Sequence, residues 1–383
     1  MNLDFKLRIN SRIPKLVPIL QIAKPEEAHV IPEIFNDAYK GTYPYKEFAD
    51  VQEVREMIND PCFHWILFKL DSGDVAGCYG FDINLEEKIG TFHGFALKRK
   101  YQKNVDTLKI IIGCTFAVYS LYQDEILVWS CEVRTAHSIT QYMGSIVGLN
   151  PIAFFPNKDR FFNRNESTIM IINHDKKALQ KHHRKDNPYI IPKASYCYLY
   201  SRLKYDLADV KYKNPIVELD SKKLEYLSKK IKIEINKYKL SYEKVTFYFE
   251  NSDSFFEFLF APNISLCEKT QYKVDCLEEL YIFIQEIKKF IKVHSVRYYE
   301  LFISAYNPTQ QKMFYNEGFM PRGYVPSWKY NKETGLFEDF IVFNFFEGKV
   351  ENVKIIPQCE ALLNTLDFTM DLESKSKYIL TKN

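Results

Sequence analysis

Long apolar runs are missing from this chain of 383 residues, and so is any large excess of one charge. No stretch approaches the roughly 20 consecutive apolar residues that a membrane-spanning helix needs, so we expect no membrane partner. The 52 basic residues nearly balance the 49 acidic ones and leave a formal net charge of +3. Nucleic-acid-binding proteins usually carry a concentrated basic excess, so we expect no nucleic-acid partner either.

A disulfide framework and a metal-binding motif are also missing. The eight cysteines form no C-x-x-C pair and follow no regular spacing, and most lie among apolar neighbours, as small core residues do. Because the sequence shows no signal peptide, we expect reduced thiols and a cytoplasmic location. His174, His182 and His183 lack Cys, Asp or Glu partners at the spacing of a metal site, so we expect no metal.

The chain does contain an internal repeat. The sequence QKNVDTL at 102–108 returns in the second half as QYKVDCL at 271–277. Gly148 and Pro151 have counterparts in Gly318 and Pro321, at almost the same offset in the numbering. A length of 383 residues suits two domains better than one, and 46% apolar residues are enough to fill two cores. The shared offset therefore predicts a tandem repeat of one domain.

Apolar periodicity predicts alternating strands and helices in both halves. In the first half we expect strands at 18–23, 63–70, 75–83, 89–97, 126–133, 152–155 and 167–173, and helices at 25–35, 50–59, 105–119 and 136–147. In the second half we expect strands at 244–249, 298–305 and 339–345, and helices at 277–290 and 307–317. We also expect an extra strand at 194–203 and a helix at 358–366. The buried face of the 105–119 helix should hold Leu108, Ile111, Ile112, Thr115, Phe116 and Tyr119.

The order of these elements resembles the GNAT (Gcn5-related N-acetyltransferase) superfamily. The helix at 307–317, together with the Gly318 and Phe319 on which it closes, is similar to the family pattern N-x-x-A-x-x-x-Y-x-x-x-G-F, with Phe314 in place of the tyrosine. The resemblance implies an α/β fold with a mixed α+β sheet, built from two tandem GNAT-like acyl-CoA N-acyltransferase domains. The implied division is an N-terminal domain at 1–175, a linker at 176–215, a degenerate C-terminal domain at 216–348 and a tail at 349–383.

The resemblance also implies acetyl-CoA as the cofactor. In the family, the fourth strand leads into a Q/R-x-x-G-x-G/A loop whose backbone amides hold the coenzyme A pyrophosphate. Gln102 takes the first position of that loop, Val105 replaces the first glycine and Thr107 takes the final small position. Valine hinders a close backbone approach, and Asp106 repels phosphate unless its side chain caps the helix. The residues expected to bind the cofactor are Phe95, Ala96, Leu97, Gln102, Lys103, Asn104, Val105 and Thr107.

Two residues are candidates for the base that deprotonates an amine, and one is a candidate for the acid. His93 lies on the fourth strand, and its ordinary pKa lies near neutrality. Glu132, at the end of the fifth strand, is the other candidate base. The family's acid is a tyrosine four residues before Gly-Phe, but that position is Gly144 here, so Tyr142 is the substitute. For His93 and Tyr142, a purely structural role in the core is the alternative.

Two functions remain open on the sequence alone. The first is an N-acetyltransferase that moves an acetyl group from acetyl-CoA to a primary amine of a small molecule or peptide. The second is a non-catalytic protein whose two GNAT folds bind a ligand or assemble with other chains. The matching loops at 155–158 and 323–328 border either the acceptor site or the contact between the domains. Nothing in the sequence determines the oligomeric state.

Overall fold

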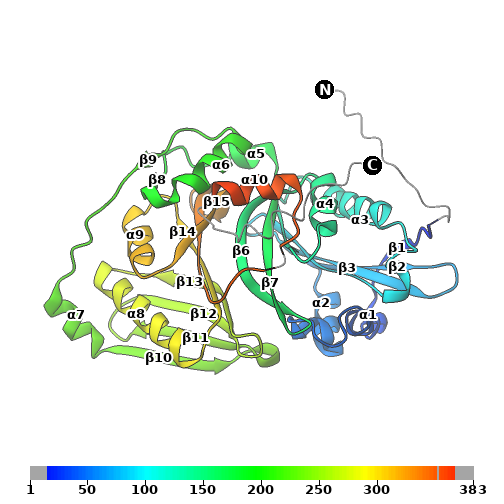
Figure 1. The fold of residues 1–383 in the computed structure, drawn as a ribbon, viewed down its shortest axis with the longest axis horizontal. Coiled ribbons are helices and arrows are strands. Elements are labelled where there is room, and N and C mark those ends of the chain that lie inside the picture. Colours follow the sequence, from blue (N-terminus) through cyan, green and yellow to red (C-terminus); the bar gives the residue numbers. More distant parts are fainter. Residues whose placement is uncertain (1–14, 352, 367–383) are drawn as a thin grey trace.

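The computed structural model describes residues 15–351 and 353–366, in which fourteen strands form one sheet (Figure 1). The strand order across this sheet is β1-β2-β3-β4-β5-β7-β6-β15-β16-β14-β13-β12-β11-β10. The strands of the first half are β1 (Ile19–Ile22), β2 (Phe63–Lys69), β3 (Val75–Asn84), β4 (Ile89–Leu97), β5 (Val128–Arg134), β6 (Asn150–Phe161) and β7 (Arg164–His174). Those of the second half are β10 (Ile231–Lys237), β11 (Glu243–Phe249), β12 (Phe255–Ala261), β13 (Leu266–Lys273), β14 (Tyr298–Ser304), β15 (Met320–Asn331) and β16 (Leu336–Phe346). The predicted α/β class with a mixed sheet is confirmed.

The strand order is mirrored about the junction of β6 with β15. Each half has one parallel pair, β4 with β5 and β13 with β14, and all other neighbours in this sheet are antiparallel. Strand β14 begins and ends at the same offset from β5 as β15 does from β6, and Gly318 lies at that offset from Gly148. The offset that the sequence showed for single glycines and prolines therefore extends over whole strands.

Helices cover both faces of the first half of the sheet (Figure 1). Side chains alternate along β2, so Trp65 and Leu67 pack with α1 (Val30–Tyr39) and α2 (Val51–Asn59), whereas Phe68 belongs to the cluster that contains α3 (Thr107–Tyr122). The predicted order of strands and helices in this half is confirmed. The other helices are α4 (Ile139–Ile146), α5 (Lys176–Gln180), α6 (Ser195–Tyr205), α7 (Ser221–Ser228), α8 (Leu277–Val293), α9 (Pro308–Asn316) and α10 (Pro357–Thr365). Short 3-10 turns are η1 (Pro25–Glu27), η2 (Lys46–Ala49), η3 (Arg99–Tyr101), η4 (Pro192–Ala194) and η5 (Lys239–Ser241).

Three local predictions are wrong. The stretches 155–158 and 323–328 are not loops but lie within β6 and β15. The stretch 194–203 is not a strand but lies largely within α6, because its buried residues Cys197, Tyr198 and Ser201 recur at helical spacing. The buried face of α3 is turned relative to the prediction: Ile112 is 45% exposed and Phe116 is 72% exposed. A helix that is apolar on nearly all sides gives no clear periodicity, so sequence alone does not choose its buried face. The face that is buried holds Ile110, Ile111, Cys114, Thr115 and Val118.

The two halves meet at the strand pair β6 and β15 and at side-chain contacts beside it. Gly323 of β15 lies opposite Ala153 of β6, and the Asn157 side-chain amide donates hydrogen bonds to the carbonyls of Glu347 and Lys349. The stretch 155–158 therefore takes part in the contact between the halves. The stretch 176–215 contains α5, α6 and the small sheet of β8 (Tyr189–Ile190) with β9 (Lys211–Tyr212), and α6 packs on β15. The predicted helix at 358–366 is α10, and the tail beyond residue 366 lies outside the described residues.

Candidate active site

A cavity of about 390 Å³ opens where β4 and β5 separate; we call it the β4–β5 cavity. The parallel pairing of these strands ends at Phe92 and Cys131. Beyond that point β4 also shifts its register against β3, and Gly94 adopts a φ of +55° in this bulge. A Cβ atom at Gly94 would lie 2.8 Å from the Phe35 ring and 3.0 Å from the Trp65 ring, so both conformation and space require glycine there.

The β4–β5 cavity reaches both faces of the sheet. On one face it is bounded by aromatic and apolar side chains of the α1–α2 region, and on the other by residues of α3, α4 and the segment after α4. The cavity therefore passes through the gap between the two strands. On the first face the lining residues include Tyr39, Tyr43, Phe48, Met57 and Phe63, and on the second they include Ile111, Thr140, Gly144, Val147 and Leu149.

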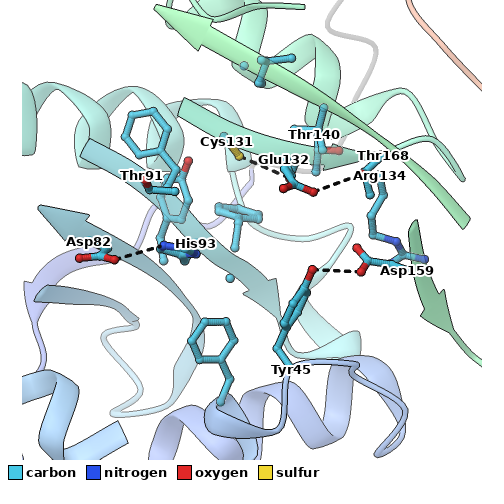
Figure 2. Close-up of a pocket in the computed structure, with 18 of the residues that line it drawn as sticks. Tyr45, Asp82, Thr91, His93, Cys131, Glu132, Arg134, Thr140, Asp159 and Thr168 are labelled. Carbon is cyan, nitrogen blue, oxygen red and sulfur yellow. Dashed lines mark hydrogen bonds and ion pairs between the residues drawn. The ribbon is translucent and has the colours of Figure 1, made fainter. Parts of the chain in front are cut away.

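Five carboxylates of the described residues line the cavity, and Figure 2 shows three of them, Asp82, Glu132 and Asp159. The cationic side chains among the lining residues are Arg134 and Lys269, and Arg134 is already held by two hydrogen bonds of 2.7 and 2.8 Å to Glu166. Acidic groups beside aromatic rings attract a cation by charge and by the ring quadrupole. The carboxylates that line the cavity are Glu47, Asp82, Glu132, Asp159 and Glu268.

A buried lysine lies behind these carboxylates. Lys158 Nζ is 2.7 Å from Glu132, 2.9 Å from Glu300 and 3.5 Å from Glu268, and the residue is 1% exposed. Burial alone would lower the pKa of Lys158, but these three carboxylates hold it well above its usual value. Glu132 and Lys158 belong to the first half of the sheet, whereas Glu268 and Glu300 belong to the second. The cluster therefore links the halves and holds Glu132 at the cavity wall.

Of the predicted catalytic residues, the structure brings two together. His93 and Glu132 both line the β4–β5 cavity, while Tyr142 is 41% exposed and does not line it. The carboxylate of Glu132 accepts hydrogen bonds from Lys158 at one oxygen and from Thr168 Oγ1 at the other, 3.1 Å away. Thr140 and Gly144 take the cavity-facing side of α4, so Tyr142, between them, faces outward.

The environment of His93 sets its charge. Its ring lies 6.1 Å from that of Phe63 and 6.3 Å from that of Phe48, and Nε2 is 3.9 Å from a carboxylate oxygen of Asp82. Burial, with a smaller contribution from the Lys269 charge, lowers the pKa of His93 to about 4. The ring is therefore uncharged at neutral pH, and it is a weak proton acceptor.

We expect the His93 ring resonances to stay constant between pH 6 and pH 8 and to move only below about pH 5, since the pKa lies near 4. A ¹H–¹³C spectrum of the histidine Cε1 groups across this range measures the midpoint, and His93→Gln assigns the signal. A midpoint between 6 and 7 would contradict this description of the site.

The loop predicted to hold the pyrophosphate is closed by its own hydrogen bonds. The backbone N–H groups of Asn104 and Val105 both donate to the Tyr101 carbonyl, 3.0 and 3.2 Å away. The N–H of Asp106 donates to the Leu16 carbonyl at 2.8 Å, so the segment before β1 covers the loop. Asp106 caps α3 by accepting from the Lys109 N–H, which places its carboxylate where a phosphate would lie.

The residues of this loop do not fit a coenzyme A pyrophosphate. Val105 is 1% exposed, and Gln102 points its side-chain amide at the Leu97 carbonyl, 3.4 Å away. Of the predicted cofactor-binding residues, Phe95 lines the β4–β5 cavity. The others lie outside its lining: Ala96 and Leu97 are buried in the core, Lys103 and Asn104 lie on the exposed surface, and Thr107 begins α3.

The corresponding loop of the second half offers no better phosphate site. The N–H of Asp275 donates to Ser254 Oγ at 2.8 Å, and α8 begins with Glu278 and Glu279. A hydrogen bond from the Asp220 N–H lowers the pKa of Glu278 to about 2, so a negative charge already occupies this helix start. The gap between β13 and β14 is bridged by Thr270, whose hydroxyl donates to the Glu300 carbonyl at 2.9 Å.

Several cavity residues escape sequence reasoning. Tyr45 and Glu47 come from the irregular segment between α1 and α2, Asp159 from β6, and Glu268 from the second half. The one available signal was the polar Asn157-Lys158 pair inside an apolar strand, next to Asp159.

All eight cysteines lie in the described part of the chain as free thiols.

Two classes of site find no support in the described residues. No helix there is long and apolar enough to cross a membrane. No group of three or more His, Cys, Asp or Glu side chains in residues 15–351 and 353–366 is arranged to hold a metal ion.

Comparisons with known proteins give a likeness of fold elements over less than half of the chain. No protein-family model matches the sequence, and no curated protein matches it. Among solved structures, a dodecameric spermidine N-acetyltransferase from Vibrio cholerae covers 43% of this chain and 98% of its own, with 11% identity and a TM-score of 0.36. A manganese complex of spermidine/spermine N-acetyltransferase SpeG from the same organism covers 43% and 95%, with 13% identity and a TM-score of 0.35. Similarity at this level transfers no property of those enzymes to the present chain.

Proposed function

We propose that the chain binds a small cationic amine in the β4–β5 cavity and transfers an acyl group to it from a thioester, as a GNAT-type N-acyltransferase. The main support for this proposal is the path of the cavity through the sheet. It joins an acidic, aromatic end beside α1 and α2 to a more apolar end beside α3 and α4, through the gap between β4 and β5. An amine and an acyl group that enter from opposite faces would meet at the β4 bulge. A volume of about 390 Å³ suits a small molecule better than a peptide.

The residues around the gap have matching roles in this proposal. Glu132, fixed by Lys158 and Thr168, would pair with the ammonium group, and the rings of Phe48 and Phe63 would cover its apolar part. His93 is uncharged at neutral pH, so it would not repel the ammonium. The backbone amides near the β4 bulge would polarise the acyl carbonyl.

The arrangement of the whole chain belongs to the same proposal. The mirrored strand order and the shared offset between corresponding strands support two tandem GNAT-like domains, at 1–175 and 216–348. The stretch 176–215 would join them and the stretch 349–383 would follow. The first domain would hold the site, with Glu268 and Lys269 of the second at its wall.

A second candidate function is a non-catalytic amine-binding protein. It is favoured by the closed loops of both halves, which leave acetyl-CoA without its usual pyrophosphate anchor. If the chain is a catalyst, the same closed loops mean that the nucleotide end of acetyl-CoA contributes little to the binding of this donor.

Acyl transfer from two donors separates these functions. With 1,4-diaminobutane as the acceptor, we expect thiol release from acetyl-CoA and from S-acetyl-N-acetylcysteamine, a thioester that lacks the pyrophosphate. The kcat/KM values of the two donors should agree within about tenfold, since the loop adds little binding of the pyrophosphate. Release of free thiol, followed with a disulfide dye, gives both constants.

Three other results would change this conclusion. Amine binding by calorimetry without thiol release from either donor would favour the second candidate. The absence of both would reject the cavity as an amine site. A preference for acetyl-CoA above about 100-fold, lost in Lys103→Ala, would mean that the loop does bind the pyrophosphate, since Lys103 is an exposed cation of that loop.

A further inference from the structure

The strand β6 carries a bulge that turns consecutive polar side chains inward. Its register against β7 shifts between Phe155 and Asp159, and Asn157 within the bulge adopts a φ of +54°. In a regular strand, neighbouring side chains point to opposite faces. Here Asn157, Lys158 and Asp159 are all buried, at 3%, 1% and 3% exposure. Lys158 thereby reaches the carboxylates between the halves, while Asp159 reaches the β4–β5 cavity.

Asp159 lies beside groups that act on its charge in opposite directions. Among the described residues, the hydrogen bond to its carboxylate comes from the Tyr45 hydroxyl, 3.0 Å away (Figure 2). Burial raises the pKa of Asp159 to about 7; Lys158 lowers it, Glu132 and Glu268 raise it, and the Tyr45 hydrogen bond lowers it. Other charged or titratable groups around it are Tyr43, Arg134 and Glu166, Arg160 on its own strand, Tyr242, and Arg297 before β14.

We propose that Asp159 is the general base of the site, which takes a proton from the ammonium group of the bound acceptor; this rests on the acyl transfer proposed above. One N–H bond of the ammonium breaks and one O–H bond forms on Asp159, which leaves a neutral amine. The amine nitrogen then forms the amide bond with the acyl carbon as the carbon–sulfur bond breaks. The second proton of the nitrogen leaves with the thiol, and Asp159 returns its proton to water.

The other groups at the gap are less suited to this step. Each oxygen of Glu132 already accepts a hydrogen bond, one from Lys158 and the other from Thr168, so this carboxylate is engaged in holding the site together. His93 has a pKa of about 4, and a proton acceptor works best when its pKa lies near the working pH. Asp159 meets that condition and touches the cavity.

The second half of the chain repeats the bulge without the base. The register of β15 against β16 shifts between Val325 and Lys329, and Ser327 has a φ of +47°. These positions lie at the offset that relates β15 to β6, so Lys329 stands where the first half has Asp159. Lys329 is exposed and places no carboxylate at that position. The proposed chemistry is therefore confined to the first half.

Substitution of Asp159 by asparagine tests the assignment. With S-acetyl-N-acetylcysteamine and 1,4-diaminobutane, we expect kcat/KM of the unsubstituted protein to fall about tenfold per pH unit below a midpoint near 7. Asp159→Asn should lower the rate by about 100-fold and remove that pH dependence. Tyr45→Phe should raise the pH of the midpoint, because it removes the hydrogen bond from Tyr45 that stabilises the ionised form of Asp159. Asp124→Asn, at a side chain that is 76% exposed, is the matched control and should change nothing.

The results that would overturn the assignment differ from those that would overturn the proposed function. If the unsubstituted protein transfers no acyl group, the proposed function fails and the base assignment fails with it. If transfer occurs and Asp159→Asn keeps the rate within threefold, or keeps the same midpoint, Asp159 is not the base and the proposed function stands. Calorimetric binding of 1,4-diaminobutane by Asp159→Asn shows that the substituted protein still forms the cavity.

Discussion

Replacement of Lys158 by methionine should lower the free energy of unfolding by about 3–5 kcal/mol at pH 7.5. Methionine keeps most of the length and the apolar contacts of the lysine side chain, so the main loss is the charge. That charge lies within 3.5 Å of three carboxylates, at a position with 1% exposure. Without it, Glu132, Glu268 and Glu300 are left as neighbouring negative charges without their shared cation. Denaturant unfolding followed by circular dichroism measures the loss.

The same experiment at lower pH identifies the cause. In Lys158→Met, repulsion among these carboxylates should raise their pKa values, so that as the pH falls the folded state takes up protons before the unfolded chain does. A folded state that binds more protons gains stability as the pH falls. The difference between Lys158→Met and the unsubstituted protein should therefore shrink between pH 7.5 and pH 5.5. An equal difference at both values would mean that lost packing, not lost charge, destabilises the variant.

A surface lysine provides the control. Lys177 forms an ion pair with Asp124 at 3.1 Å, but its side chain is 51% exposed. Exposed pairs contribute about 0–1 kcal/mol, so Lys177→Met should change the stability by no more than that at either pH. The contrast separates the effect of burial from the general effect of removing a positive charge.

The order of strands and helices in the first half could be predicted from sequence because most of its elements carry their own periodicity, although α3 does not. The shared offset was visible in the sequence because the same backbone conformation is needed twice. Gly148 and Gly318 each follow a helix at a positive φ, +86° and +95°, which glycine adopts without strain. Such positions keep their residue type in both halves even where the surrounding side chains differ.

The site was harder to predict because some of its residues lie at regular strand positions, whereas others depend on a bulge or on the contact between the halves. His93 and Glu132 could be found since each lies at a recognisable place on a strand. Asp159 reaches the cavity through a bulge, whose local signal is the polar Asn157-Lys158 pair in an apolar strand. Glu268 reaches it through the contact between the halves, which has no local sequence pattern. Valine in place of the family's glycine did indicate that the predicted loop is not an open phosphate site. Val105 is buried, and the Leu16 backbone hydrogen-bonds across the loop and closes it.

The junction of the two halves allows a second prediction with a large effect, at Gly323. Its backbone lies against that of β6, and a Cβ atom there would be 2.4 Å from Ala153 Cβ, 2.6 Å from the Ile152 carbonyl oxygen and 2.7 Å from Ala153 Cα. Two of these atoms belong to the backbone and cannot turn away. Gly323→Ala should therefore cost about 3 kcal/mol or more, the upper end of what overpacking usually costs. Thermal unfolding and denaturant unfolding both measure this loss.

A double variant shows how much of that cost comes from overlap with the Ala153 side chain and how much comes from overlap with the backbone of β6. Ala153→Gly removes the nearest atom, so Gly323→Ala combined with Ala153→Gly should regain part of the stability. Recovery should stay incomplete because the carbonyl of Ile152 and the Cα of residue 153 remain within 2.7 Å. Gly113→Ala is the control: its nearest neighbour is the end of the Leu20 side chain, which can move, and alanine favours a helix by about 1 kcal/mol. Full recovery in the double variant, or no loss in Gly323→Ala, would mean that the halves do not pack backbone against backbone. The close junction would then not be what brings Glu268 to the cavity of the first half.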